Sequence, residues 1–383
     1  MPPLLYLFTL TNLAIGTGAF VLTGILVPVS QALGVSVAAA GQAMTAYAFA
    51  SALIAPLMML ATGRWSRKNA LLLSLGLFTV GCALSAMAQS LTMLLIGRVL
   101  MGAGSVFSPL ASGVVVAIVD AGRRGRALSL SFLGIGLSYA IGLPLGAWLG
   151  FGYGWQVPVW AVTGMCLVMT ALLAWALPAR IEAPGASFKG LRQVAGHWPI
   201  LRVWIRTLLY FVAIFSVFSY IGPVLQALNP LTPGQLSLML VSFGLSGVVG
   251  TVSGGWAADR FGAIRTLRVQ LTVLAAMMAL VPLTQGSIVL CAVAFVAWGI
   301  AGFGMMPPQQ LLLATHAPQQ APLLLSLNVS MLYLGTALGA VVSGAMVGML
   351  GFAKLSWVGL PFALVALGTL WFDAHPRPAP AAA

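Results

Sequence analysis

Three long stretches of this chain contain no charged residue, and they limit the possible folds more than any other feature. No Asp, Glu, Lys or Arg occurs before Arg64, between Arg206 and Asp259, or between Arg268 and Lys354. A helix needs only about 20 apolar residues to cross the hydrocarbon core of a bilayer, so each stretch can hold a helical hairpin or more. The core of a soluble domain is interrupted by charged surface positions every few residues. The sequence therefore predicts an integral membrane protein.

Composition supports this prediction. Hydrophobic residues make up 61% of the 383 residues and charged residues 5%, whereas soluble domains carry roughly 25% charged residues. The start, Met1-Pro2-Pro3-Leu4, lacks the basic segment of a signal peptide, so we expect the first apolar stretch to remain as a span. The three cysteines, Cys82, Cys166 and Cys291, lie in separate apolar segments and are expected to be small buried hydrophobes, without a disulfide or metal.

Polar breaks rich in Gly and Pro divide the chain into twelve apolar segments. Lipid offers no partner to an unpaired backbone group, so continuous apolar segments of this length should be helices. The predicted fold class is thus an all-α membrane protein with twelve transmembrane helices. The predicted spans are 4–29, 38–60, 69–88, 91–119, 127–149, 157–177, 201–226, 234–257, 267–283, 287–314, 322–349 and 355–372.

Basic residues gather on one side of this topology. Fifteen of the seventeen Lys and Arg residues fall in loops or tails that twelve spans place together, while Lys354 lies on the other side and Arg98 within the fourth span. The positive-inside rule makes the crowded side cytoplasmic, with both termini inside and Lys354 outside. The net charge of +13 then reflects orientation and lipid contact rather than a nucleic-acid surface.

The longest polar connection divides the chain into similar halves. We expect a six-helix bundle over 1–177, a cytoplasmic loop over 178–200, and a second six-helix bundle with a short tail over 201–383. Basic loops follow the second span (Arg64 to Lys68) and the eighth span (Asp259 to Arg265), about half the chain apart. Two parallel six-helix repeats are the architecture of a transporter that works by alternating access.

The loop after the eighth span carries the most specific motif, Gly254-Gly255-Trp256-Ala257-Ala258-Asp259-Arg260-Phe261-Gly262. It resembles the G-x-x-x-D-R-x-G loop of the major facilitator superfamily. Over nearly its whole length the chain is similar to the twelve-helix drug-and-sugar efflux branch, which includes arabinose, chloramphenicol and purine-nucleoside exporters. The resemblance implies a conformational latch at Asp259, Arg260 and Gly262. An Asp at a helix end can cap backbone N–H groups, and the Arg can brace an adjacent helix or a lipid phosphate.

The first half carries a variant of this motif. Gly63 stands where the superfamily has Asp, and Thr62-Gly63-Arg64-Trp65-Ser66-Arg67 resembles the form seen in the sugar-efflux branch. We expect a first-half latch that is based on Arg64 and Arg67, or that uses Asp120 at the end of the fourth span.

The fourth span contains Arg98, followed by Gly102 and Gly104, which resembles the R-x-x-x-G-x-G motif of the branch. An Arg at the bilayer centre costs roughly 2.5–3.5 kcal/mol on insertion scales, so it normally faces the bundle interior with a partner. The resemblance implies a gating role. Because Arg98 lies only some seven residues into the span, snorkelling to the surface is the alternative.

The fifth span contains Gly142, Pro144 and Gly146, which resemble a loosened antiporter motif of the branch. Small residues let helices approach closely and Pro permits a kink. Ordinary helix packing explains the pattern equally well.

Polar and aromatic residues inside apolar spans are the candidate substrate-binding residues. Polar side chains at membrane depth usually face the bundle and hydrogen-bond there, so a packing role is the alternative for each. As a set they suit a neutral or aromatic organic substrate, and in the superfamily helices 1, 4, 7 and 10 line the cavity. The set is Asn12, Gln42, Tyr47, Phe107, Tyr139, Phe215, Tyr220, Trp298, Gln309, Asn328 and Tyr333, with Tyr47, Tyr220 and Asn328 as the strongest candidates.

Some groups are missing from the sequence. The four acidic residues, Asp120, Glu182, Asp259 and Asp373, all fall at predicted helix ends or in loops, and Ala19 stands where relatives carry an acidic residue on the first helix. No carboxylate is thus expected at mid-membrane to carry a proton. No catalytic constellation and no phosphate-binding loop occurs, so we expect neither an enzyme nor an ATP-driven pump, and no cofactor or metal.

We therefore predict a monomeric secondary transporter of the cytoplasmic membrane that exports small neutral or amphipathic molecules such as sugars, nucleosides or drugs. Relatives of the branch are mostly proton antiporters, but the residues predict weak or absent coupling to protons. The alternatives are an uncoupled facilitator or importer and a transport-inactive receptor on the same fold.

Overall fold

The structure is a computed structural model that describes residues 3–120, 124–178, 181, 197–316 and 321–373. The regular secondary structure in these residues is helical throughout, with no strand. Twelve segments of helix, from Leu4–Gly24 to Phe352–Phe372, are long and apolar enough to cross a membrane. The predicted twelve-helix fold is confirmed. Most of the predicted central loop, and the tail with Arg377, lie outside the described residues.

We call spans one to six the N-terminal half and spans seven to twelve the C-terminal half, following the division expected from the sequence. The helices of the N-terminal half are α1 (Leu4–Gly24), α2 (Leu26–Leu33), α3 (Val37–Ala61), α4 (Arg67–Ala86), α5 (Leu91–Gly104), α6 (Phe107–Ile118), α7 (Arg124–Leu137), the π-helix η2 (Ser138–Gly142), α8 (Leu143–Tyr153) and α9 (Gln156–Ala176). Those of the C-terminal half are α11 (Trp198–Phe218), α12 (Ile221–Leu228), α13 (Pro233–Phe261), α14 (Ala263–Leu280), η4 (Val281–Thr284), α15 (Ile288–Gly304), α16 (Met306–His316), α17 (Ala321–Leu350), η6 (Phe352–Lys354), α18 (Leu355–Thr369) and η7 (Leu370–Phe372).

Spans one and seven are each broken near one end, although the sequence predicted continuous helices there. The break residues, Ile25 and Tyr220, adopt nearly identical backbone angles, φ −123° and ψ 26° against φ −124° and ψ 26°. Pro28 and Pro223 have no N–H with which to donate to the carbonyl four residues earlier, which explains the interruption. The short helices that follow, Leu-Val-Pro-Val-Ser-Gln-Ala-Leu and Ile-Gly-Pro-Val-Leu-Gln-Ala-Leu, are similar in sequence. The break is therefore a feature that both halves share.

Spans four and ten each contain a milder irregularity, between α5 and α6 and between α15 and α16, where Ser105, Val106 and Met305 keep right-handed helical backbone angles. Each is one span, over Leu91–Val115 and Ile288–His316, as the predicted spans over 91–119 and 287–314 require. Broken helices in transporters supply irregular backbone at the place where substrate binds. Among the four spans that the family resemblance assigns to the cavity, spans one and seven are thus broken, and spans four and ten are locally irregular.

Span five contains a π-helical turn, η2, in place of regular α-helix. Pro144 cannot donate to the carbonyl of Ala140, and the backbone N–H of Leu143 instead reaches back five residues to the carbonyl of Ser138. Such π turns inside α-helices are frequent at functional sites. The turn places the backbone of Tyr139 and Ala140 against Gly244 of α13, in the C-terminal half.

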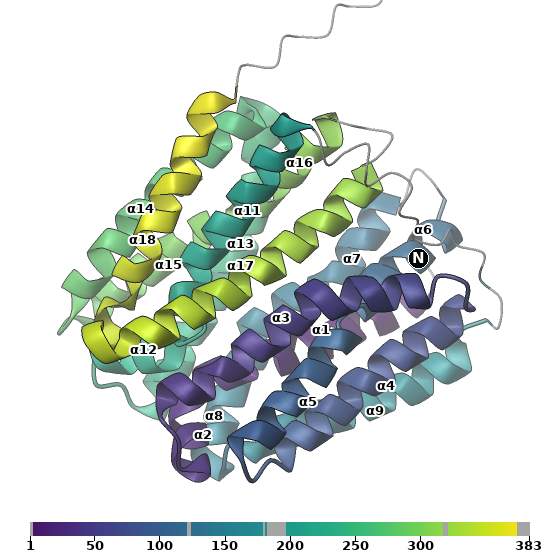
Figure 1. Cartoon of the computed structure of the whole chain (residues 1–383), viewed down its shortest axis with the longest axis horizontal. Coiled ribbons are helices and arrows are strands. Elements are labelled where there is room, and N and C mark those ends of the chain that lie inside the picture. The colour runs from purple at the N-terminus through teal and green to yellow at the C-terminus, as the bar shows by residue number, and fades with distance from the viewer. Residues whose placement is uncertain (1–2, 121–123, 179–180, 182–196, 317–320, 374–383) are drawn as a thin grey trace, which may run out of the picture.

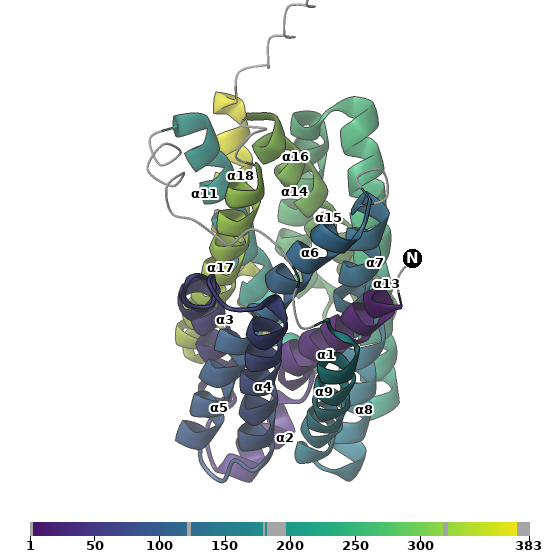
Figure 2. The same ribbon diagram turned by 90° about the vertical axis from the view of Figure 1, so that its right-hand side faces the viewer.

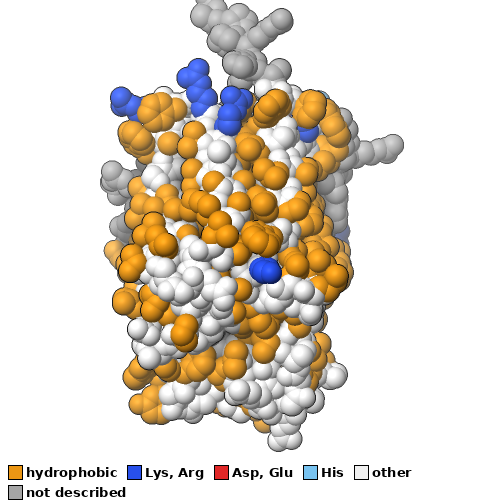
Figure 3. Space-filling view, turned by 90° about the vertical axis from the view of Figure 1, so that its left-hand side faces the viewer, with side chains coloured by type: hydrophobic (Ala, Val, Ile, Leu, Met, Phe, Trp, Pro, Cys, Tyr) orange, Lys and Arg blue, Asp and Glu red, His pale blue; other side chains and the backbone are white. Residues whose placement is uncertain are grey.

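The two halves lie side by side (Figure 1). α3 and α17 run next to each other across the middle of this view, and α8 and η2 contact α13 elsewhere along the same boundary. α2 and α12 lie at one end of the molecule, which we call the far end, while α16 and the C-terminal end of α18 lie at the opposite end (Figures 1 and 2). We call that opposite end the basic end. In a view of the C-terminal half, most Lys and Arg side chains gather there, above a largely apolar face (Figure 3).

Candidate functional site

A cluster of aromatic rings joins the two halves. Phe20 of α1 and Tyr139 of η2 stack with ring centroids 4.9 Å apart. Phe218 of α11 lies 5.8 Å from Phe20 and 5.7 Å from Tyr139. Phe215 lies 6.1 Å from Phe20, and Phe303 of α15 lies 5.0 Å from Tyr139. These distances are typical of attractive ring pairs. We call these five residues the interface cluster, because its rings come from both halves.

The interface cluster continues into the core of the C-terminal half. Phe243 contacts Phe218 at 5.5 Å and Phe303 at 5.7 Å, and it stacks on Trp298 at 5.0 Å. The gap between Phe243, Trp298 and Phe303 is too narrow to hold a water molecule. Trp298, a predicted substrate residue, is therefore packed behind the interface cluster in this state.

Tyr47 and Tyr333 form a second contact between the halves. Tyr47 of α3 and Tyr333 of α17 meet edge to face at 6.1 Å. Tyr47 is 1% exposed, while Tyr333 is half-buried. The structure thus brings two of the predicted substrate residues together, where they add phenolic hydroxyls to a boundary otherwise rich in phenyl rings.

Tyr220, another strong candidate, lies at the far end beside Gln42. Its hydroxyl is 3.3 Å from the carbonyl oxygen of Ala38 in α3 and 3.3 Å from that of Ala340 in α17. The side chain of Gln42 lies beside the same hydroxyl. Tyr220 therefore contacts both halves at the break that separates α11 from α12.

Two other candidates lie inside the N-terminal half. The amide of Asn12 donates to the carbonyl of Ser131 at 2.9 Å, and its oxygen accepts from the hydroxyl of Ser108 at 2.7 Å. Asn12 is 0% exposed, so it joins spans one, four and five and has both polar atoms occupied. Phe107 packs edge to face on Phe8 at 6.1 Å within the same half. A packing role accounts for both residues in this state.

Gln309 and Asn328 are buried in the C-terminal half. The oxygen of Gln309 accepts a 3.4 Å hydrogen bond from Arg206. Asn328 is 0% exposed, and neither its amide nitrogen nor its oxygen has a partner among the described residues. A buried amide without partners is costly, which keeps Asn328 a candidate for binding a polar group.

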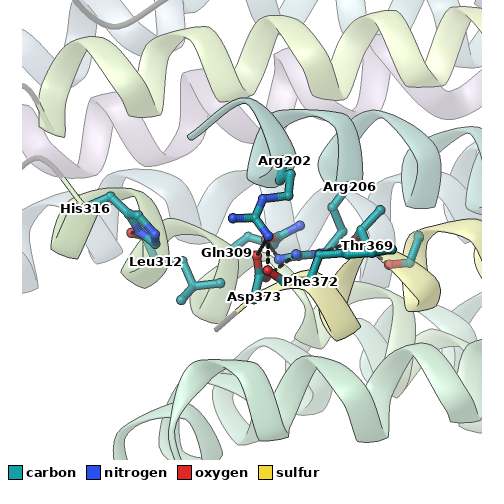
Figure 4. Close-up of polar contacts among 9 residues, drawn as sticks. Arg202, Arg206, Gln309, Leu312, His316, Thr369, Phe372 and Asp373 are labelled. Carbon is teal, nitrogen blue, oxygen red and sulfur yellow. Dashed lines mark hydrogen bonds and ion pairs between the residues drawn. The ribbon is translucent and has the colours of Figure 1, made fainter. Parts of the chain in front are cut away.

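An ion-pair cluster at the basic end was missed by the sequence analysis (Figure 4). The carboxylate of Asp373 pairs with Arg206, and Arg202 lies 3.3 Å from its other oxygen. Arg206 also donates to the hydroxyl of Thr369 at 2.8 Å. Arg202 and Arg206 are one helical turn apart in α11 and so share a face. That spacing was the available signal, but nothing in the sequence pairs them with an acid at the end of span twelve.

Arg98 is buried inside the N-terminal half and does not snorkel. It is 1% exposed, and its Nη1 donates to the carbonyl oxygens of Gly18 at 2.9 Å and Ala19 at 3.1 Å. Its Nε and Nη2 have no hydrogen-bond partner among the described residues. Arg98 thus holds α1 through its backbone, one to two turns before the break at Ile25.

The loop after span eight differs from the expected capping arrangement. α13 continues to Phe261, and α14 begins at Ala263 with Gly262 as its N-cap residue and no side-chain cap, so the expectation that Asp259 caps a helix was wrong. Gly262 has φ 88°, a conformation that favours glycine. Asp259 is exposed, and the guanidinium of Arg260 lies 5.7 Å from the ring of Trp256.

The first-half latch residues lie at the same basic end. Gly63 and Arg64 are in the turn between α3 and α4, where Arg64 is exposed, whereas Arg67 is 5% exposed in the first turn of α4. Asp120 is exposed beside residues 121–123, which lie outside the described part.

The glycines of span five let it approach span one closely. A Cβ atom at Gly142 would overlap the side chain of Thr17, and one at Gly146 would overlap that of Val21. Together with the π turn caused by Pro144, this close approach places Tyr139 next to Phe20. The predicted helix-packing residues therefore position the N-terminal part of the interface cluster.

Comparisons with known proteins agree with this architecture. The family model described as Major Facilitator Superfamily matches residues 8–322 and 231–383. The chain belongs to the major facilitator superfamily. The family and the sequence relatives named below are transporters rather than enzymes.

Two sequence relatives illustrate the similarity. The chain is 31% identical over 366 residues to the inner membrane transport protein YdhP of Escherichia coli (strain K12), covering 95% of this chain and 94% of that protein. It is 28% identical over 384 residues to the uncharacterized MFS-type transporter YbcL of Bacillus subtilis (strain 168), covering 98% and 97%.

Solved structures show the same fold at low sequence identity. A bacterial homolog of the human lysosomal transporter Spinster, in an inward-facing and occupied conformation, superposes with a TM-score of 0.83 at 15% identity and 96% coverage of both chains. A D-xylose–proton symporter superposes with a TM-score of 0.78 at 18% identity and the same coverage.

Proposed function

We propose that this transporter exports small neutral or amphipathic organic molecules, such as sugars, nucleosides or drugs, from the cytoplasm by alternating access. The observation that carries the proposal is the interface cluster, in which Phe20 and Tyr139 of one half meet Phe215, Phe218 and Phe303 of the other. If the halves rock apart, these ring faces separate, and an organic molecule can take the place of the opposite rings. Tyr47 and Tyr333 supply hydroxyls for its polar groups.

The absence of a counter-charge favours a neutral substrate. The interface cluster contains no carboxylate and no basic side chain, and the chain has only four acidic residues, of which Asp373 pairs with two arginines at the basic end. Arg98 is turned toward the backbone of α1. A strongly cationic molecule would therefore leave water without compensation at this interface.

We further propose that the basic end faces the cytoplasm, so that both termini are inside and Lys354 is outside. The distribution of Lys and Arg supports this orientation, and the name of the Escherichia coli relative supports the inner membrane. A cysteine placed at Lys354 should react with a membrane-impermeant maleimide added to intact cells, whereas one at Arg64 should not. The reverse pattern would overturn the orientation.

At the basic end, Asp259, Arg260 and Gly262 are proposed to latch one conformation, with Arg64 and Arg67 as their first-half counterparts. Asp259→Asn removes a charge while keeping the shape of the side chain. Because Asp259 is exposed, the variant should fold normally and transport poorly. Transport at the parental rate with equal protein in the membrane would reduce the motif to an orientation signal.

An uncoupled facilitator is the second candidate, since the one carboxylate within a described span is that of Asp259, which is exposed in the last turn of α13. The D-xylose–proton symporter is named as proton-coupled, but a likeness at 18% identity supports the fold alone. We propose weak or absent proton coupling. Substrate accumulation driven by a pH difference alone, at matched membrane potential in proteoliposomes, would overturn this part.

The proposed function is tested directly by flux. Purified protein in proteoliposomes is offered arabinose, inosine and chloramphenicol separately, and a melting-temperature screen with the same compounds shows which of them bind, because a ligand of the native state raises the melting temperature. We expect saturable flux of at least one compound, reduced at least tenfold by Tyr139→Ala. Exposed Phe132→Ala on α7 is the control and should leave flux unchanged. Binding and flux absent for all three classes would contradict the substrate assignment.

A further inference from the structure

The far end of the boundary between the halves is closed by one aromatic ring seated between two glycines. A Cβ atom added at Gly41 of α3 would overlap the ring of Tyr220. A Cβ at Gly344 of α17 would lie 2.6 Å from both the Tyr220 hydroxyl and the Gln42 amide nitrogen. Real Cβ atoms do not approach other atoms this closely. Gly41 and Gly344, which we call the two-glycine notch, therefore leave the space that the Tyr220 ring fills.

Hydrogen bonds hold the ring in the notch. Tyr220 is 0% exposed, and its hydroxyl lies 3.3 Å from carbonyl oxygens on both α3 and α17. A hydroxyl donates one hydrogen bond at a time, so it can exchange between the two halves without leaving its seat. Because a buried phenol needs a partner, separating α3 from Tyr220 also removes one of its two acceptors.

A second contact closes the same end beside the notch. A Cβ at Gly222 of α12 would lie 2.6 Å from the carbonyl oxygen of Gly24 in α1. That carbonyl receives no hydrogen bond from Pro28 four residues later, since proline has no N–H. The two repeated breaks, at Ile25 and Tyr220, thus bring backbone against backbone where the halves meet.

We propose that Tyr220 and the two-glycine notch form the gate at the far end, and that a side chain at Gly41 prevents this gate from closing. Opening requires the Tyr220 ring to leave α3, and closing requires an unfilled space at Gly41. A β-branched side chain at Gly41 occupies that space, and a close-packed boundary has no other room for the ring. The proposal rests on alternating access as the proposed function, and it adds the residues that close the substrate path at the far end.

The test measures the width of the far end by electron spin resonance between two spin labels in proteoliposomes. The labels are attached at Ala32→Cys of α2 and Gly234→Cys of α13, which are exposed positions on opposite halves. The native cysteines are replaced by Ala so that only these two positions are labelled; they are Cys82, Cys166 and Cys291. In Gly41→Val we expect the main distance to lengthen by on the order of 5 Å, the scale of rearrangements in switching proteins. Gly41→Ala is the milder second variant. Gly348→Val is the matched control, because a Cβ there meets open space.

Removing the ring should reverse the effect. In Gly41→Val combined with Tyr220→Ala, the main distance should return to the parental value, because the new side chain now fits the emptied space. Parental distances in both Gly41 variants, or lengthening in Gly348→Val, would overturn the gate. Lengthening that persists in the double variant would also overturn it, since the Tyr220 ring is then not the obstacle. The measurement needs no substrate, so absent flux of arabinose, inosine and chloramphenicol contradicts the proposed function and leaves the gate result standing.

Discussion

Arg98 in the N-terminal half and Arg206 in the C-terminal half are both buried, at 1% and 0% exposure, but their charges are compensated differently. Arg206 has a carboxylate, a hydroxyl and an amide oxygen as partners, supplied by Asp373, Thr369 and Gln309. Arg98 has two backbone carbonyls on α1 and no described acidic partner. The comparison shows that burial alone does not define what an arginine does. Arg206 links α11 to α16 and to the end of span twelve. Arg98 is a buried charge that only backbone carbonyls of the broken span one are seen to compensate.

The largest expected effect follows from removing the acid of the paired arginine. Asp373→Asn leaves Arg206 buried without its counter-charge, and breaking a buried pair in this way costs about 3 kcal/mol. The melting temperature in detergent should fall by several degrees. Asp259→Asn is the matched control, because that carboxylate is exposed and makes no ion pair among the described residues. Equal melting temperatures for the two variants would show that the Asp373 cluster contributes little.

A smaller stability effect is expected when Arg98 is removed. Arg98→Leu deletes a desolvated charge, and the carbonyls of Gly18 and Ala19 lie within regular helix, so the free energy of unfolding should change by no more than about 1 kcal/mol. Flux should nevertheless fall, because α1 loses the side chain that holds it next to the break at Ile25. Thermal melting and proteoliposome flux measured on one preparation separate the two effects. A stability loss as large as that of Asp373→Asn would make Arg98 a packing residue.

These two arginines also show what the sequence could and could not predict. The charge-free runs and the spacing of the basic loops predicted the number of spans correctly. This was possible because a segment's ability to cross a membrane depends mainly on its own residues. Arg98 was singled out because an Arg inside a span is costly. The partnership of Arg206 with Asp373 was missed, since it joins positions 167 residues apart that meet only after the C-terminal half has packed.

The helix breaks were missed for a related reason. Pro28 and Pro223 are visible in the sequence, but a proline in a membrane helix produces either a mild kink or a full break, depending on which neighbouring groups satisfy the freed carbonyl. The site residues were predicted as a set of polar and aromatic positions. Their assignment to the boundary or to the interior of one half depends on helix rotation, which apolar segments do not reveal because they are hydrophobic on every face.

The smallest expected effect comes from a variant that supplies Arg98, in the N-terminal half, with an acidic partner. Ala19→Glu places a carboxylate on the residue whose carbonyl Arg98 already binds. A titrating group at this depth should make flux depend on an imposed pH difference, whereas the parental protein should show little dependence. Ala19→Gln keeps the size without the charge and serves as the control. Equal pH dependence in all three proteins would indicate that coupling does not involve this position.

The central claim is that substrate passes between the halves, and a reversible cross-link tests it most directly. Tyr47→Cys with Tyr333→Cys joins α3 to α17 across the boundary, while Phe8→Cys with Phe107→Cys joins spans one and four inside one half, and both ring pairs are 6.1 Å apart in the parent. A short reducible dithiol cross-linker is applied to each, and flux of arabinose, inosine and chloramphenicol is measured before and after reduction. The account predicts that flux stops in the cross-linked Tyr47/Tyr333 protein, returns on reduction, and continues in the Phe8/Phe107 protein. Undiminished flux with the two halves joined would contradict it.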